Sequence, residues 1–220
     1  MTRYKPKEAT LSQLLQDYVT VSFESTPSST AALHLILMEL ATRPELVEIL
    51  RQEIREVMVD GKLPKTHLTE LRKMDSVMRE SALGLYRLLR VPTRLSTGPV
   101  LPAGTLICVD VHHIHGSKDI WTNPDDFNGL RFYDIRKAPG MENKYQFVST
   151  GADSPGWGDG PMACPGRLFA NSTIKIALVH LIMHYDFKFR DGEGKPIKSS
   201  LPNGSWNPGM DVTLLFKSRK

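Results

Sequence analysis

Apolar residues recur at helical spacing through residues 11–58 and predict two helices. The first series comprises Leu11, Leu14, Leu15, Tyr18 and Val19 and resumes between Ala32 and Leu40, as expected for one buried face of a helix. The second begins near Pro44 and places charges opposite an apolar stripe of Leu46, Ile49, Leu50, Ile54 and Val57. Between the halves of the first series, residues 23–30 (F-E-S-T-P-S-S-T) contain Pro27, which is expected to kink or break the helix.

The pattern changes in the rest of the chain, where helices alternate with short extended runs. The predicted order is a helix from Leu68 to near Leu89, strands and turns over residues 91–111, an irregular polar segment over residues 137–154, an amphipathic helix after Cys164, and a terminal hairpin closed by V-T-L-L-F. The expected fold class is therefore mostly α with small β-sheets (α+β), in a single domain over residues 1–220.

Composition narrows the function classes only a little. The chain has 220 residues, of which 40% are hydrophobic and 24% charged, and a formal net charge of +4. This mild charge does not favour a nucleic-acid partner, and two cysteines give no disulfide framework, as in proteins of reducing compartments. Neither a run of 18 apolar residues nor a signal-peptide pattern occurs, so no membrane anchor is expected in this chain.

The stretch with the clearest chemistry is W-G-D-G-P-M-A-C-P-G-R, residues 157–167. Pro165 and Gly166 are typical of a helix start and place Cys164 at a helix N-terminus, where unpaired N–H groups favour an anionic thiolate. Gly158 and Gly160 allow the loop to lie close to a flat ligand, so the pattern suggests a thiolate bound to haem iron. The alternative is a structural cysteine buried behind a glycine turn.

This stretch resembles the haem-binding signature of the cytochrome P-450 superfamily, F-x-x-G-x-x-x-C-x-G, with Trp157 in place of the leading aromatic residue, and C-P-G-R-L-F-A is similar to fungal members. The resemblance implies heme b with Cys164 as the iron ligand. It also implies a set of cofactor-binding residues, namely Arg94 against a haem propionate, Trp157, Gly158, Gly160 and Gly166. Met162 stands where many relatives have a propionate-binding histidine or arginine, which should weaken haem retention.

The resemblance also assigns proton delivery to residues 23–30. It places Ser28, followed by Ser29, in the position of the threonine that helps deliver protons to bound oxygen, and Pro27 in that of its titratable neighbour. A serine can relay protons, whereas a proline cannot. A plain loop between two helices remains an equal alternative for this segment.

A third set of residues resembles the family's structural ion pair. M-D-S-V-M-R-E-S-A-L is similar to the helix that bears E-x-x-R, with Glu80 as the glutamate and Leu83 in place of the arginine. Arg131, in a stretch similar to P-x-x-F-x-x-x-R-F, is expected to pair with Glu80. Arg87 follows Glu80 by seven residues and is a candidate replacement for the missing arginine if both lie on one helix face. Loss of one partner of such a pair costs about 3–5 kcal/mol.

The resemblance covers nearly all of the chain but accounts only for the carboxy-terminal half of such an enzyme. The amino-terminal half and its membrane anchor, which holds full-length relatives at the endoplasmic reticulum, have no counterpart. One hypothesis is a monooxygenase that takes two electrons from an NADPH-dependent reductase and inserts one oxygen atom into an apolar small molecule of fungal secondary metabolism. The other is a truncated, inactive remnant or incomplete gene product, at most a weak haem binder, supported by Leu83, Pro27 and Met162.

Overall fold

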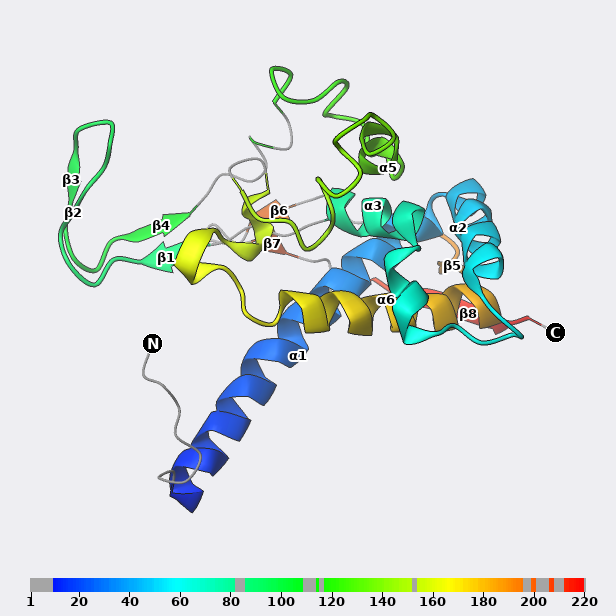
Figure 1. The fold of residues 1–220 in the computed structure, drawn as a ribbon, viewed down its shortest axis with the longest axis horizontal. Coiled ribbons are helices and arrows are strands. Elements are labelled where there is room, and N and C mark those ends of the chain that lie inside the picture. The colour runs from blue at the N-terminus through cyan, green and yellow to red at the C-terminus, as the bar shows by residue number, and fades with distance from the viewer. Residues whose placement is uncertain are drawn as a thin grey trace.

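The computed structural model describes residues 10–81, 86–108, 114, 117–151, 154–195, 199–200, 206–207 and 212–219. Its main helices are α1 (Leu11–Ala41), α2 (Pro44–Val57), α3 (Arg72–Glu80), α5 (Arg131–Ile135) and α6 (Arg167–His184), joined by the 3-10 helices η1 (Lys65–Thr69), η2 (Pro155–Trp157) and η3 (Gly160–Met162). Figure 1 shows α6 crossing α1, with α2 and α3 gathered near the C-terminal part of α1. The prediction of a mostly helical fold with small sheets is confirmed.

Helix α1 begins at a capping box and continues through its proline. Thr10 Oγ1 accepts a hydrogen bond from Gln13 N at 3.3 Å, and Gln13 Oε1 accepts one from Thr10 N at 2.9 Å. Pro27 lies inside the helix, so the interpretation of residues 23–30 as a loop is wrong. The proline removes the hydrogen bond to the carbonyl of Phe23. Phe23 is 77% exposed, so water can take the place of that bond.

Helix α3 ends earlier than the apolar pattern predicts. Its last residue is Glu80, and the N–H of Ser81 turns back to the carbonyls of Val77 and Arg79. Residues 86–88 form strand β1, in which Arg87 pairs with Ile107 of β4. The predicted helix up to Leu89 is therefore wrong, because pairing with a strand some twenty residues away overrides the local helical spacing.

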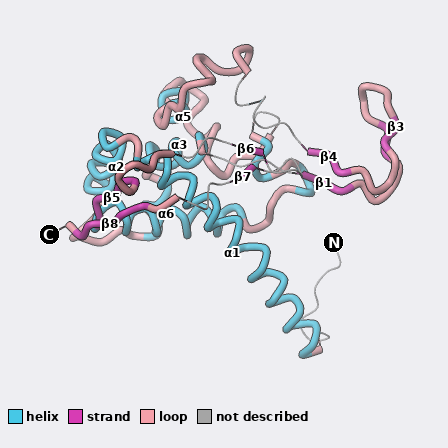
Figure 2. The backbone as a smooth tube through the Cα atoms, turned by 180° about the vertical axis from the view of Figure 1, so that it is seen from behind, coloured by secondary structure: helices cyan, strands magenta, loops and turns pink. Residues whose placement is uncertain are grey.

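The strands of the described ranges form four separate antiparallel pairs. These are β1 (Tyr86–Leu88) with β4 (Leu106–Cys108), β2 (Thr93–Arg94) with β3 (Val100–Leu101), β5 (Tyr185–Phe189) with β8 (Leu214–Ser218), and β6 (Ser199–Ser200) with β7 (Trp206–Asn207). The β2–β3 hairpin extends away from the helices, whereas β5 and β8 lie beside α6 (Figure 2). The β5–β8 pair is the predicted terminal hairpin.

One hydrophobic cluster joins α1, α2, α3 and α6. Its members are Ile36, Leu37 and Leu40 of α1, Leu46, Val47, Leu50 and Ile54 of α2, Leu68, Leu71, Met74, Val77 and Met78 from η1 to α3, Phe147, and Ile174, Leu178 and Ile182 of α6. Every α1 member lies after Ala32, and the first half of α1 projects from the rest of the chain as an exposed helix (Figure 1). Among the described helices, none combines the length and the hydropathy needed to cross a membrane.

Buried polar side chains cap the short helices around this core. Glu53 of α2 accepts hydrogen bonds from Lys73 N at 2.6 Å and Met74 N at 2.9 Å, at the N-terminus of α3. Ser76 Oγ accepts from Phe132 N at 3.1 Å and Tyr133 N at 3.0 Å, at the start of α5. The otherwise unpaired N–H groups of two helix starts are thereby satisfied.

Replacing Glu53 by glutamine tests whether burial raises the pKa of the Glu53 carboxyl group in the folded protein. Burial raises the pKa of Glu53, despite the hydrogen bonds from Lys73 N and Met74 N. A folded-state pKa above the unfolded value stabilises the fold at low pH, and this contribution is lost as the pH rises through the folded-state pKa. The free energy of unfolding of the wild type, relative to Glu53→Gln, should therefore fall as the pH rises from about 4 towards about 7. Urea denaturation measures it.

The control is Glu56→Gln, which changes an exposed carboxylate of the same helix. Its stability relative to the wild type should stay nearly constant over that pH range. A wild type that gains stability over Glu53→Gln with rising pH would show that the helix N-terminus, rather than burial, dominates.

Candidate functional site around Cys164

Cys164 lies in a loop held by hydrogen bonds on both sides. Its backbone N–H donates to Trp157 O at 2.7 Å, and Arg167 Nη1 donates to Cys164 O at 2.9 Å. Gly166 is the N-cap of α6, and Cys164 lies three residues before its first residue, Arg167, near the helix N-terminus as predicted. The thiol is free and half-buried. The other cysteine, Cys108, ends strand β4.

The glycines of the loop serve two different purposes. Gly158 and Gly160 have φ angles of 76° and 55°, in the left-handed region that side chains disfavour. A Cβ at Gly166 would lie 3.9 Å from Cys164 Sγ, so a side chain there would occupy space beside the sulfur. The loop therefore keeps one face of the thiol open.

The residues near the thiol fit a metal carried by a large apolar cofactor. Met162, Leu168 and Phe169 flank Cys164 in sequence and are 72%, 62% and 70% exposed. Among the described residues, no group of three or more His, Cys, Asp or Glu side chains could hold a metal ion. Among the described residues, a metal at Cys164 would thus have fewer than three protein ligands, one of them a soft sulfur, and an organic group could supply the others.

Trp157 faces the core with its ring. The indole Nε1 donates to Phe147 O at 2.5 Å, and the two rings meet edge to face with centroids 5.2 Å apart. Phe147 is 4% exposed and belongs to the hydrophobic cluster. Trp157 therefore anchors the loop to the core through its indole and binds Cys164 N through its backbone carbonyl.

The other residues expected to serve a cofactor lie on separate elements. Ser28 and Ser29 are in α1, the helix that α6 crosses, and the Ser28 hydroxyl donates to Ser25 O at 3.4 Å. Arg94 is exposed on β2, and its Nη1 donates to Gly98 O at 3.0 Å within the same hairpin. The Arg94 guanidinium is thus hydrogen-bonded to the turn of its own hairpin.

Glu80 and Arg131 form a buried ion pair. Arg131 Nε donates to both carboxylate oxygens of Glu80 at 3.1 Å, and Asn128 N donates to Glu80 Oε1 at 3.1 Å. The two side chains are only 11% and 9% exposed. Burial raises the pKa of Glu80, and the bonds from Asn128 and Arg131 offset this only in part. The other donors of Arg131 bind the carbonyls of Thr122, Asn123 and Asp126.

The two remaining positions of the predicted ion-pair cluster do not join it in the described structure. Leu83 lies outside the described residues. Arg87 lies on strand β1 rather than on the helix of Glu80, so the argument that the two share a helix face is wrong. Among the described residues, the buried carboxylate of Glu80 is therefore paired with Arg131 and accepts a hydrogen bond from the backbone N–H of Asn128.

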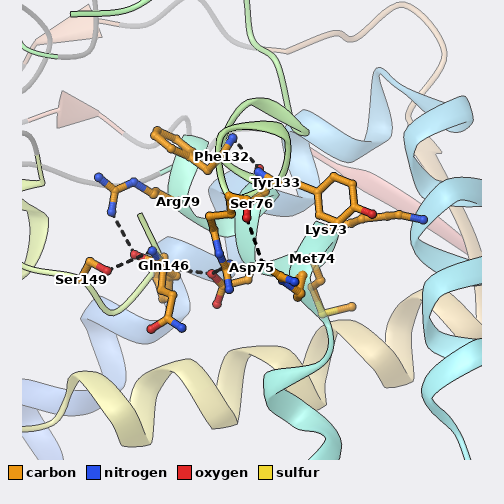
Figure 3. Close-up of polar contacts among 12 residues, drawn as sticks. Lys73, Met74, Asp75, Ser76, Arg79, Phe132, Tyr133, Gln146 and Ser149 are labelled. Carbon is orange, nitrogen blue, oxygen red and sulfur yellow. Dashed lines mark hydrogen bonds and ion pairs between the residues drawn. The ribbon is translucent and has the colours of Figure 1, made fainter. Parts of the chain in front are cut away.

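Sequence reasoning missed a second buried charge cluster, centred on Asp75. Asp75 Oδ2 lies 3.1 Å from Arg136 Nη1, and Asp75 Oδ1 lies 2.9 Å from Lys175 Nζ. Figure 3 shows Asp75 turned toward the segment that carries Gln146 and Ser149, where Phe147 N donates to Asp75 Oδ2 at 3.0 Å. The available signal was a charged residue inside each of two apolar helix stripes, because charged side chains are rarely buried unless paired.

Comparison with known proteins identifies relatives over nearly the whole chain. The family described as "Cytochrome P450" matches residues 2–212. The cytochrome P450 monooxygenase ffsD of Aspergillus flavipes is 52% identical over 226 residues, which cover 100% of this chain and 43% of the relative. Pyrichalasin C-18 hydroxylase of Pyricularia grisea is 50% identical, with 100% of this chain and 42% of the relative covered. The chain thus spans less than half the length of these curated relatives.

A solved structure supports the same fold. The retinoic acid bound cyanobacterial CYP120A1 superposes with a TM-score of 0.68 at 20% sequence identity, covering 91% of this chain and 45% of that chain. The predicted resemblance to the fungal cytochrome P-450 superfamily is confirmed by these matches.

Replacing Arg131 by methionine tests how much stability depends on its pairing with Glu80. The variant leaves the Glu80 carboxylate buried without its cation, so the free energy of unfolding should fall by about 3–5 kcal/mol. Urea denaturation followed by far-UV circular dichroism measures the change. The control is Lys137→Met, which breaks the exposed pair with Asp134 and should cost no more than about 1 kcal/mol. Equal losses in the two variants would contradict the central role of Arg131.

Proposed function

The chain belongs to the cytochrome P450 family, and we propose that Cys164 is the thiolate ligand of its haem iron. Members of this family bind haem, use electrons from a redox partner and act on apolar substrates. The observation that carries the proposal is the place of Cys164. It is a free, half-exposed thiol just before α6, in a loop where Gly166 leaves space beside the sulfur.

We further propose the reaction of a fungal monooxygenase. One oxygen atom from O2 is inserted into an apolar small molecule of secondary metabolism. The other oxygen atom takes up two protons and leaves as water, and an NADPH-dependent reductase supplies the two electrons. The relatives support this class, since they include a monooxygenase and a hydroxylase from fungi. The substrate and the position oxidised belong to the whole enzyme of which such a chain forms part.

The residues of the chain have distinct tasks in this proposal. Bound haem supplies the activation of O2. Cys164 presents its sulfur just before the start of α6, and Gly166 leaves room beside that sulfur. Hydrogen bonds from Cys164 N to Trp157 O and from Arg167 Nη1 to Cys164 O hold the ligand in place.

Proton supply is assigned to α1. Ser28 and Ser29 each carry a hydroxyl that can accept and pass on a proton, and Pro27, which precedes them, carries no such group. The Ser28 hydroxyl donates to Ser25 O, so it already takes part in hydrogen bonding along the helix. Arg94 is proposed to bind a haem propionate, which requires its guanidinium to exchange Gly98 O for the carboxylate.

A second candidate function is haem binding without turnover. Its support is the uncovered apolar surface on the first half of α1, where Leu11, Tyr18 and Phe23 are 72%, 72% and 77% exposed. A large exposed apolar surface marks a missing binding partner or favours aggregation. Met162 adds to this case, because it offers no charge to a propionate.

A reduced, carbon monoxide difference spectrum of the purified chain, expressed with haem supply, tests the proposal. The wild type should give a thiolate-type Soret band, because Cys164 provides the sulfur, and Cys164→Ala should lose it. The matched control is Cys108→Ala, which removes the only other cysteine and should keep the band. A band that persists in Cys164→Ala, or none in the wild type, would sink the proposed ligand.

Turnover separates the two candidate functions once the band is present. The haem-loaded chain is mixed with NADPH and a cytochrome P450 reductase, and NADPH consumption is compared with that of Cys164→Ala. Consumption above this background supports the monooxygenase, and consumption at background supports haem binding alone.

A further inference from the structure

Three hydrogen bonds in series join Asp75 of α3 to Cys164. Phe147 N donates to Asp75 Oδ2 at 3.0 Å, Trp157 Nε1 donates to Phe147 O at 2.5 Å, and Cys164 N donates to Trp157 O at 2.7 Å. The series joins α3 to the segment over residues 147–164, which begins 72 residues after Asp75. It reaches Cys164 from its N-terminal side, through the loop that leads to it.

The same carboxylate also reaches Cys164 from its C-terminal side. Asp75 Oδ1 lies 2.9 Å from Lys175 Nζ. Lys175 is 2% exposed and belongs to α6, the helix that begins three residues after Cys164. Its ammonium group also donates to Leu68 O at 3.1 Å. The segment before Cys164 and the helix after it are thus both linked to the buried carboxylate of Asp75.

Arg136 completes the surroundings of this carboxylate. Its Nη1 lies 3.1 Å from Asp75 Oδ2, and its Nε donates to Glu142 O at 3.2 Å. Asp75, Arg136 and Lys175 are 5%, 3% and 2% exposed. Charges this deeply buried persist only when they are paired and hydrogen-bonded, so these contacts define one orientation of the Asp75 side chain. Figure 3 shows the carboxylate beneath the backbone near Gln146.

We propose that Asp75 is a positioning residue for Cys164, acting through Phe147 and Trp157 on the loop and through Lys175 on α6. The inference rests on the proposed role of Cys164 as the haem ligand. Both the segment before Cys164 and the helix after it are linked to Asp75. A movement of the Asp75 side chain therefore changes the position of the sulfur relative to the start of α6. Asp75 touches neither the thiol nor the cofactor surface, so its effect is on geometry.

A substitution of Trp157 can break the hydrogen-bond series between Asp75 and Cys164 without changing a charged residue. In Trp157→Phe the ring can still pack against Phe147, but the indole N–H that bonds Phe147 O is lost. A matched control is Trp121→Phe. Trp121 is 7% exposed, its indole donates to Ile114 O at 3.0 Å, and its ring meets Phe132 edge to face at 5.3 Å. Each variant loses one indole hydrogen bond and keeps an aromatic contact.

The first measurement is amide hydrogen exchange at Cys164 in the haem-free full chain. The Cys164 N–H is protected by its bond to Trp157 O, so its exchange should become roughly fivefold faster in Trp157→Phe and stay unchanged in Trp121→Phe. The second is the reduced, carbon monoxide difference spectrum of the haem-loaded chain. Phenylalanine is the residue of the family signature at this position, so Trp157→Phe should keep part of the thiolate-type band. Its share should fall below the wild-type level because the bond to Phe147 O is lost, and it should stay at the wild-type level in Trp121→Phe.

A pair of double variants tests Asp75 itself with the charge held constant. D75N/K175M keeps an amide oxygen to accept from Phe147 N, whereas D75L/K175M removes the acceptor at similar size. Both variants leave Arg136 without its carboxylate, so the loss of the charge pairing is common to them. They differ in whether an oxygen remains to accept from Phe147 N and Arg136 Nη1. Faster exchange at Cys164 and a smaller thiolate band in D75L/K175M than in D75N/K175M are expected.

The outcomes separate the inference from the proposed function. A wild type without a thiolate band overturns the proposed ligand, while the exchange rates still decide whether the link reaches Cys164. A wild type with the band, together with Trp157→Phe indistinguishable from Trp121→Phe in both measurements, overturns the inference and leaves the proposed ligand standing. Equal exchange in the two double variants likewise excludes Asp75 as the anchor.

Discussion

The structure depends on keeping one carboxylate, Asp75, inside the helical core. A buried charge is tolerated only when opposite charges and hydrogen bonds replace the water it has lost. Arg136, Lys175 and the N–H of Phe147 provide this replacement. These partners come from the end of α5, from α6 and from the irregular segment before the cysteine loop, so one requirement for pairing holds these three segments to α3.

The Glu80–Arg131 pair works in the same way at the other end of α3. Arg131 binds both oxygens of Glu80 and also three backbone carbonyls, and therefore orders the chain before α5. The two ion-pair clusters fasten opposite ends of a nine-residue helix, which is too short to be stable alone. The hydrophobic cluster supplies the bulk of the burial, and the ion pairs select how the irregular segments lie over it.

This arrangement explains why an irregular loop can present a metal ligand. Loops make few contacts of their own, yet the cysteine loop is tied through Trp157 to Phe147 of the core and continues directly into α6. A ligand on such a loop needs supporting residues to hold it. The first half of α1 is not held in this way, because no described part of the chain covers its apolar residues.

The sequence by itself determined the family, the mostly helical class, the helix after Cys164 and the terminal hairpin, because these follow from local motifs, apolar spacing and turn residues. It left Pro27 and residues 86–89 misjudged. A helix can continue through a proline where water replaces the lost bond, and strand β1 exists because of its distant partner β4. Only the tertiary structure decided that Asp75 and Lys175 pair and that the indole of Trp157 turns to Phe147. Asp75 and Lys175 lie far apart in the chain, and Phe147 and Trp157 lie ten residues apart in an irregular segment, so no helix or strand spacing encodes either contact.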